Sequence, residues 1–192
     1  MADPRRANRG VGPEEMVLNA CEYYKRHGAA LLDKVPTPTH AKKGGGLFYA
    51  RRSIVDFIGT LPGGISVALE VKSSNLRTRF DLNHLMAEQH QIEYLRDQHR
   101  LGGISAYMLV WKLDGLPRCN LVSWSTAREW IKDRRPSLDL DTLKALPFLC
   151  AFRLEMQGFH FLPALLEVMA PDQRLAYQHW FDRDELPLVR IG

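Results

Sequence analysis

The stretch from Arg51 to Lys72 reads RRSIVDFIGTLPGGISVALEVK, and the surrounding chain can be interpreted around it. Its Leu-Pro-Gly-Gly segment is a turn signal, so the residues before and after it are predicted to pair as a hairpin. In a strand, side chains two positions apart share one face. Glu70 and Lys72 are therefore expected to point into one site, and Asp56 is expected to join them from the neighbouring strand.

The strand that follows the turn has two unlike faces. One face is apolar and consists of Ile65, Val67, Leu69 and Val71. The opposite face carries Ser66, Ala68, Glu70 and Lys72, and it is polar at its end. This alternation is typical of a strand with one face in the core. We expect a site at the polar end of the second face.

Two acids and a lysine in this pattern are the residue types that metal-dependent phosphodiester hydrolysis needs. A divalent cation held by carboxylates neutralises the phosphodiester charge and lowers the pKa of a bound water. Mg²⁺ prefers oxygen ligands and keeps several waters, so two or three carboxylates suffice. The lysine can hold the nucleophilic water or stabilise charge in the transition state. Against this hypothesis, Glu-x-Lys is common on solvated sheet faces, and an aspartate before a glycine-containing turn is mostly turn chemistry.

Composition and charge restrict the class of protein. A chain of 192 residues, 45% hydrophobic and 25% charged, predicts one globular domain rather than disorder. The net charge of +4 is compatible with a nucleic-acid partner. Three scattered cysteines predict neither a disulfide framework nor a zinc site, and they suit a reducing cytoplasm. No apolar run is long enough to span a membrane, and the first residues lack the hydrophobic core of a signal peptide.

Local patterns predict an α/β fold with a mixed central sheet flanked by helices. Residues 1–12 are predicted to be a flexible basic arm. A single domain over 13–192 follows, with a core at about 13–135 and a C-terminal helical extension at about 136–192. Helices are predicted at 13–28, 83–100, 124–132, 162–169 and 172–180, and strands at 29–34, 47–50, 53–57, 65–72, 104–111 and 119–123.

Seven short pieces of the chain, in order, carry a family resemblance. They are Asn-Arg-Gly before Glu14, then NACEYY at 19–24, KVPTP at 34–38, VDF at 55–57, LEVK at 69–72, HQIE at 90–93 and GGI at 102–104. Together they cover roughly residues 8–125, and the set is more specific than any one piece. The chain resembles the RecU-type Holliday junction resolvases, a branch of the PD-(D/E)xK nucleases.

The resemblance implies a restriction-endonuclease-like nuclease fold and a role for each matching residue. Asp56 and Glu70 would be metal ligands, Lys72 the catalytic lysine, and Glu14 an additional carboxylate at the metal. Gln91 would position water or substrate. From the residues alone, Glu14 is also explained as an acid that favours the start of a helix, and the adjacent Glu15 is an alternative candidate for the same role. Gln91 is also explained as part of a solvated helix face.

The sequence departs from the family pattern at three places. Val55 stands where the family often has a hydroxyl residue before the aspartate, and Ser53 is a possible replacement. The region between Pro38 and Asp56, a protruding stalk in the family, is here a short loop rich in lysine and glycine. The tail from about residue 170 has no clear counterpart.

Basic residues concentrate on both sides of the acidic motif, as a site for a polyanion requires. Phosphate contacts of this kind position a duplex without reading its bases. The predicted DNA-binding residues are Arg9, Lys34, Lys42, Lys43, Arg51, Arg52, Arg77 and Arg79.

The resemblance implies a homodimeric endonuclease, dependent on Mg²⁺ with Mn²⁺ as a substitute, that makes paired symmetric nicks in four-way DNA junctions. A two-fold dimer would match the approximate two-fold symmetry of the junction. Two alternatives remain open at this stage. One is a restriction or repair enzyme of the same nuclease class, and the other is a junction-binding module that does not cut.

Overall fold

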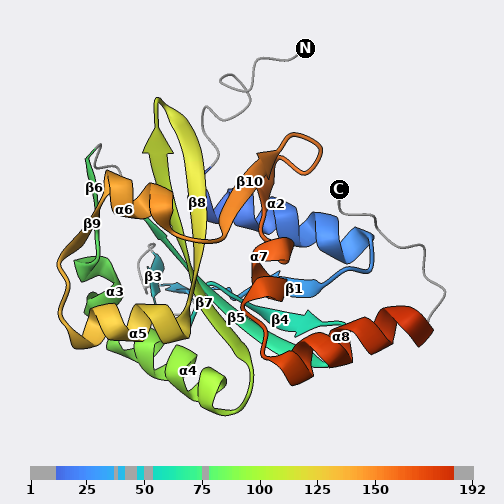
Figure 1. Ribbon diagram of the computed structural model, residues 1–192. Helices are drawn as coiled ribbons and strands as arrows, with labels where there is room; N and C mark the ends of the chain where they lie inside the picture. The colour runs from blue at the N-terminus through green and yellow to red at the C-terminus, as the bar shows by residue number, and fades with distance from the viewer. Residues whose placement is uncertain (1–11, 37–38, 42–46, 50–53, 75–77, 184–192) are drawn as a thin grey trace.

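The computed structural model describes residues 12–36, 39–41, 47–49, 54–74 and 78–183. Among these residues, a seven-stranded mixed sheet forms the centre, and β5 and β7 are its one parallel pair. Across the sheet the strands are β1 (Leu31–Lys34), β4 (Phe57–Leu61), β5 (Ile65–Ser73), β7 (Ile104–Leu113), β8 (Leu116–Ser123), β10 (Leu149–Arg153) and β11 (Gly158–His160). The predicted α/β class with a mixed central sheet is confirmed (Figure 1).

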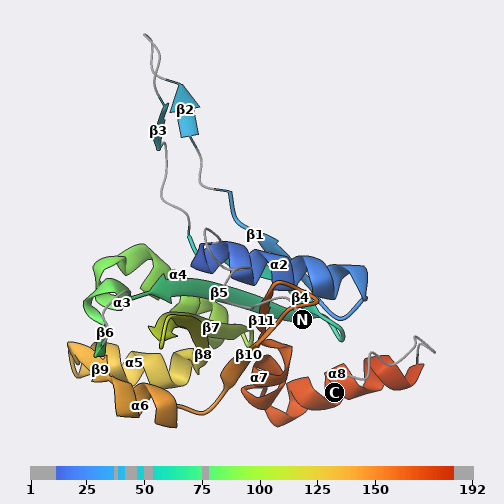
Figure 2. The ribbon, with the colours of Figure 1, turned by 90° about the horizontal axis from the view of Figure 1, so that it is seen from above.

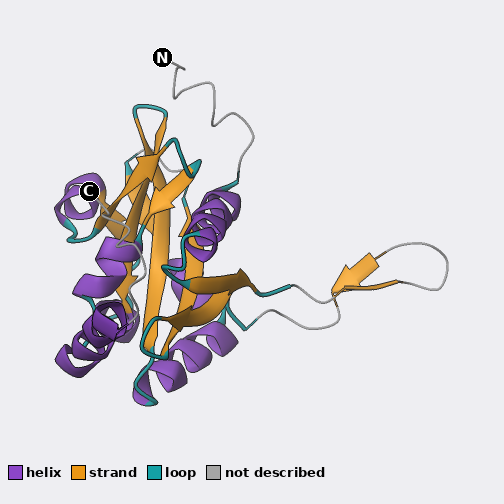
Figure 3. Ribbon diagram, turned by 90° about the vertical axis from the view of Figure 1, so that its right-hand side faces the viewer, coloured by secondary structure: helices purple, strands orange, loops and turns teal. Residues whose placement is uncertain are grey.

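Helices cover both faces of this sheet (Figure 3), and each face has its own apolar cluster. The first cluster packs the sheet against α2 (Pro13–Arg26), α7 (Leu162–Glu167) and α8 (Pro171–Arg183). The second packs it against α3 (Asn83–Ala87), α4 (Gln89–Arg100), α5 (Trp124–Lys132) and α6 (Leu140–Ala145). Residues 104–111 of β7 are buried because alternate side chains enter opposite clusters, as the continuous apolar run predicts.

The predicted hairpin around Leu-Pro-Gly-Gly is present. β4 and β5 are antiparallel, with Leu61 opposite Ile65, and Gly63 and Gly64 take positive φ values of 83° and 76° in the turn. Glycine is favoured there because it has no Cβ to clash in the left-handed region. The strand predicted at 53–57 is wrong in its start, since β4 begins at Phe57 and Asp56 precedes it.

A second hairpin corrects the expectation of a plain loop between Pro38 and Asp56. β2 (Thr39–Ala41) and β3 (Leu47–Tyr49) pair antiparallel, separate from the main sheet. Figures 2 and 3 show this hairpin projecting from the body of the molecule. Its two strands flank a sequence with three consecutive glycines, which suits a chain reversal. Lys42 and Lys43 lie outside the described residues.

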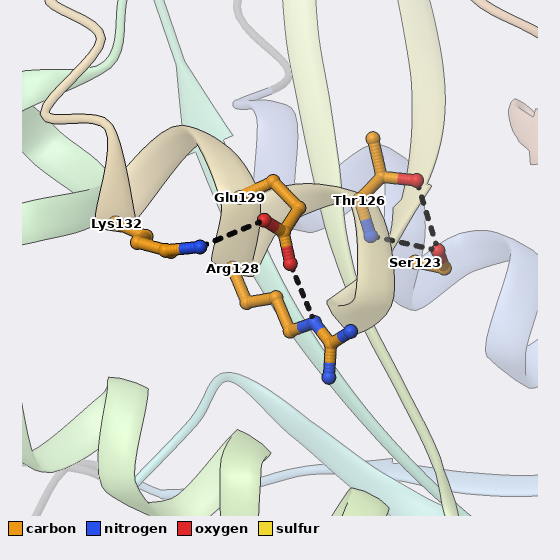
Figure 4. A network of polar contacts seen from close by, with 5 residues as sticks. All are labelled: Ser123, Thr126, Arg128, Glu129 and Lys132. Carbon is orange, nitrogen blue, oxygen red and sulfur yellow. Dashed lines mark hydrogen bonds and ion pairs between the residues drawn. The ribbon is translucent and has the colours of Figure 1, made fainter.

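Most predicted helices are confirmed, and their ends have local causes. The helix predicted at 83–100 is divided, because Glu88, with ψ of 75°, lies between α3 and α4. Ser123 caps α5, and its side chain accepts a hydrogen bond from the Thr126 N–H at 3.3 Å (Figure 4). Glu129 holds two basic neighbours on the exposed side of α5, Arg128 at 3.0 Å and Lys132 at 3.9 Å.

The C-terminal segment predicted to be helical also contains strands. β9 (Ser137–Asp139) pairs with β6 (Arg79–Asp81), whereas β10 and β11 extend the main sheet beyond β8. β9, β10 and β11 have only three to five residues each, so they gave too little periodic signal to outweigh the helical pattern predicted for this segment. The helices predicted near 162–169 and 172–180 are present as α7 and α8. Within the described residues, no helix combines the length and apolar character needed to cross a bilayer.

Gly158 lets β11 lie directly on α2. A Cβ added there would collide with the backbone oxygen of Met16 and lie 3.1 Å from the backbone nitrogen of Ala20. Gly158→Ala is therefore expected to lower the free energy of unfolding by about 2 kcal/mol, because the added methyl group must push the helix off the strand. Urea denaturation measures this. Gly12→Ala, where an added Cβ meets nothing within 4 Å, is the control and should cost less, because it loses only the preference for glycine over alanine at the N-cap of α2.

Candidate active site

Asp56 is fixed at the start of β4 by bonds to both neighbouring strands. Its backbone oxygen accepts from the Val35 N–H at 2.8 Å, and its Oδ2 accepts from the Val71 N–H at 2.8 Å. The β4–β5 register pairs Phe57 with Leu69, so one further step places Asp56 opposite Glu70. The expected meeting of these two acids across the hairpin is therefore present.

Lys72 and Glu70 share one face of β5, as the two-residue spacing predicts. The Lys72 Nζ lies 2.7 Å from Glu70 Oε1 and donates a hydrogen bond to Gln91 Oε1 at 2.8 Å. Gln91 comes from the first turn of α4 and is 9% exposed, so it does not belong to a solvated helix face. The structure thus brings Asp56, Glu70, Lys72 and Gln91 together.

The two acids lie in an environment that disfavours their charged forms. Burial and, to a smaller extent, the neighbouring Asp56 raise the pKa of Glu70 from 4.5 to about 7, although Lys72 opposes the shift. Burial also raises the pKa of Asp56, against the lowering effect of the Val71 N–H bond. Glu70 is only 1% exposed. Among the described residues, its buried Oε2 has no hydrogen-bond partner.

These features fit a divalent cation. A carboxylate oxygen that is buried and unpaired costs free energy unless a donor or cation satisfies it. Paired carboxylates with raised pKa values would be stabilised in their charged form by a nearby positive ion, and carboxylate oxygens are the ligands that Mg²⁺ prefers. Asp56 and Glu70 are therefore suitable ligands for such a cation, and they already lie close to each other.

Glu14 and Lys34 lie at the edge of this group. Lys34 Nζ contacts Glu14 Oε2 at 2.6 Å, and both residues act electrostatically on Asp56. They line a pocket of about 300 Å³ with Gly12, Pro13, Glu15, Val71 and Ser73. In the part of the chain that the structure describes, no three acidic, histidine or cysteine side chains converge on one metal position. The role of Glu14 as a third ligand stays a prediction.

The other predicted DNA contacts are mostly beyond the described part of the chain. This applies to Arg9, Lys42, Lys43, Arg51, Arg52 and Arg77, and also to Ser53. Arg79 is exposed on β6. Val55, at the family's hydroxyl position, is completely buried in the second apolar cluster.

Sequence reasoning missed one polar group beside the acids. Tyr107 pairs with Glu70 in the parallel β5–β7 register, and its side chain is completely buried. It lies within the apolar run 104–111, where the pattern indicates only a core strand. The available signal was its hydroxyl, but Ser105 carries another hydroxyl in the same run, so the sequence does not single out Tyr107.

The family profile for RecU, described as Recombination protein U, matches residues 8–163. The chain belongs to the RecU family. The match includes Glu14, Asp56, Glu70, Lys72 and Gln91, and it ends before α8.

Named relatives agree with this assignment. The chain is 28% identical over 149 residues to the Holliday junction resolvase RecU of Mycoplasmopsis pulmonis, an alignment covering 74% of this chain and 92% of that protein. It is 29% identical over 116 residues to the protein of that name from Geobacillus sp., covering 55% and 56%. For the protein from Geobacillus kaustophilus the identity is 27% over 137 residues, covering 64% and 67%.

Proposed function

We propose that this RecU-family protein is a Mg²⁺-dependent endonuclease that resolves four-way DNA junctions by hydrolysing phosphodiester bonds. The observation that carries the proposal is the convergence of Asp56, Glu70 and Lys72, with one buried carboxylate oxygen that has no hydrogen-bond partner among the described residues. Membership of a family whose named relatives are Holliday junction resolvases supports the choice of substrate.

The proposed cofactor is Mg²⁺, with Mn²⁺ as a substitute. Asp56 and Glu70 would hold it, and Glu14 is the proposed third carboxylate. When bound, such an ion neutralises charge on the phosphodiester and lowers the pKa of a coordinated water. The Val71 N–H keeps one Asp56 oxygen oriented.

Lys72 is the proposed residue that acts on the reacting phosphate. Its Nζ is held between Glu70 Oε1 and Gln91 Oε1, so the ammonium group has a fixed position. A fixed positive charge beside the reaction centre stabilises negative charge that develops in the transition state, without the cost of reorienting solvent. Gln91, which accepts a hydrogen bond from Lys72, would keep the lysine in this orientation.

The protruding hairpin supports a branched substrate. β1 leads into β2, and β3 leads back to Asp56 and β4, so the projection leaves the body beside the acids. DNA held by the hairpin would lie near the proposed catalytic group. A homodimer with two-fold symmetry would place two such sites on opposing strands of a junction, as paired nicks require.

The test compares cleavage of a four-way junction, a linear duplex and a flap of equal sequence in Mg²⁺. We expect paired symmetric nicks in the junction and little cutting of the other two. Equal cutting of linear duplex would indicate a different nuclease activity. Junction binding without cutting in Mg²⁺ or Mn²⁺ would indicate a non-cleaving module. Light scattering of the free protein should give the mass of a dimer.

A further inference from the structure

Two buried polar atoms without partners lie on adjacent strands. Glu70 Oε2 and the Tyr107 hydroxyl both lack a hydrogen-bond partner among the described residues, and neither is accessible to solvent. Glu70 and Tyr107 are paired in the parallel register of β5 and β7, where neighbouring strands are about 4.8 Å apart. Buried polar atoms in native proteins are nearly always satisfied, so two neighbouring exceptions need an explanation.

The two side chains lie on the same face of the sheet. Ala68, two residues before Glu70, and Tyr107 both belong to the second apolar cluster. Burial raises the pKa of Tyr107, and the charge of Glu70 adds a smaller rise, which agrees with the closeness that the register implies. The Tyr107 ring is 0% exposed and packs with Leu95 and Val122 in that cluster, so its hydroxyl cannot turn to bulk water.

A purely structural role does not explain the tyrosine. Phenylalanine would fill the same space without a buried hydroxyl, and removing an unpaired polar group is neutral or stabilising. A hydroxyl retained beside a catalytic acid is explained if it holds that acid, because carboxylates that bind metals are usually hydrogen-bonded themselves.

We propose that Tyr107 is a positioning residue of the active site. Its hydroxyl donates to the charged Glu70 carboxylate, directly or through one water, and fixes the orientation in which that carboxylate binds the cation. This inference rests on the proposed function, because the role of Glu70 as a metal ligand is part of that proposal.

The test is Tyr107→Phe in the full-length protein. The affinity of the free protein for Mn²⁺, measured by calorimetry without DNA, should fall about 10-fold. The Mn²⁺ concentration needed for half-maximal junction cleavage should rise by the same factor. Junction binding in the absence of metal should not change. The melting temperature should stay the same or rise, because an unpaired hydroxyl is removed.

Tyr24→Phe is the matched control. Tyr24 is equally buried, but its hydroxyl accepts from the Phe161 N–H at 2.9 Å and the Leu162 N–H at 3.2 Å. This variant should lose stability and keep wild-type Mn²⁺ affinity. Unchanged Mn²⁺ affinity in Tyr107→Phe, or a loss of stability like that of Tyr24→Phe, would overturn the inference.

Asp56→Asn separates this inference from the proposed function. If Asp56→Asn loses Mn²⁺ binding and cleavage while Tyr107→Phe behaves as wild type, only the role of Tyr107 is wrong. If Asp56→Asn keeps both, the proposed metal site itself is wrong.

Discussion

Asp56→Asn is expected to abolish junction cleavage and to leave junction binding intact. The substitution removes a negative charge from the proposed metal site at nearly constant shape, and the amide oxygen can still accept from the Val71 N–H. Removing a group that only supports a metal ligand typically lowers metal affinity or activity about 10- to 100-fold. Removing a ligand itself should therefore reduce the cleavage rate by more than about 100-fold. Cleavage in Mg²⁺ and gel-shift binding in EDTA measure the two effects separately.

A matched control lies on the neighbouring strand. Asp33 of β1 is an exposed acid that pairs with Lys25 at 3.1 Å and has no part in the proposed metal site. Asp33→Asn should cut at the wild-type rate, because a surface ion pair contributes little. Undiminished cleavage by Asp56→Asn would place the catalytic acid elsewhere. Loss of junction binding in that variant would show that Asp56 serves folding or DNA contact instead.

The centre of the site could be predicted because it is local in sequence. A turn signal and a two-residue alternation suffice to bring Asp56, Glu70 and Lys72 together across one hairpin. Gln91 lies on a helix 19 positions beyond Lys72, so its place in the site came from family resemblance rather than from periodicity.

The parts that sequence reasoning missed depend on pairings between distant segments. Tyr107 meets Glu70 only through the parallel register of β5 and β7, and the sequence pattern does not determine that register. β11 is three residues long, and its position depends on the close approach of Gly158 to α2 near the other end of the chain. The strand at 47–50 was predicted, but its pairing with β2 was missed because β2, three residues long, is too short for a periodic signal.

Glu70→Gln is expected to stabilise the metal-free protein at alkaline pH. The ordinary glutamate pKa is 4.5, and burial beside Asp56 raises that of Glu70 to about 7 in the folded state. Between these values the folded protein keeps a proton that the unfolded chain releases, so the free energy of unfolding falls as pH rises from about 4.5 to 7. At 1.36 kcal/mol per pKa unit, the loss is up to about 3 kcal/mol.

Glutamine is neutral throughout, so the variant should avoid this loss. Urea unfolding in EDTA should show similar stability for both proteins near pH 4.5 and a gain of up to about 3 kcal/mol for Glu70→Gln at pH 8. Glu93→Gln, which changes an exposed glutamate on α4, should follow the wild type across the range.

Added Mg²⁺ should reverse the order of the two proteins at pH 8. A ligand that binds only the folded state raises its stability, and the wild type keeps the carboxylate that the cation requires. The wild type should therefore gain stability from millimolar Mg²⁺, and Glu70→Gln should gain little. Parallel pH profiles for the two proteins in EDTA would mean that Glu70 is not held in a charge-disfavouring site. A metal response that survives in Glu70→Gln would remove Glu70 from the ligand set.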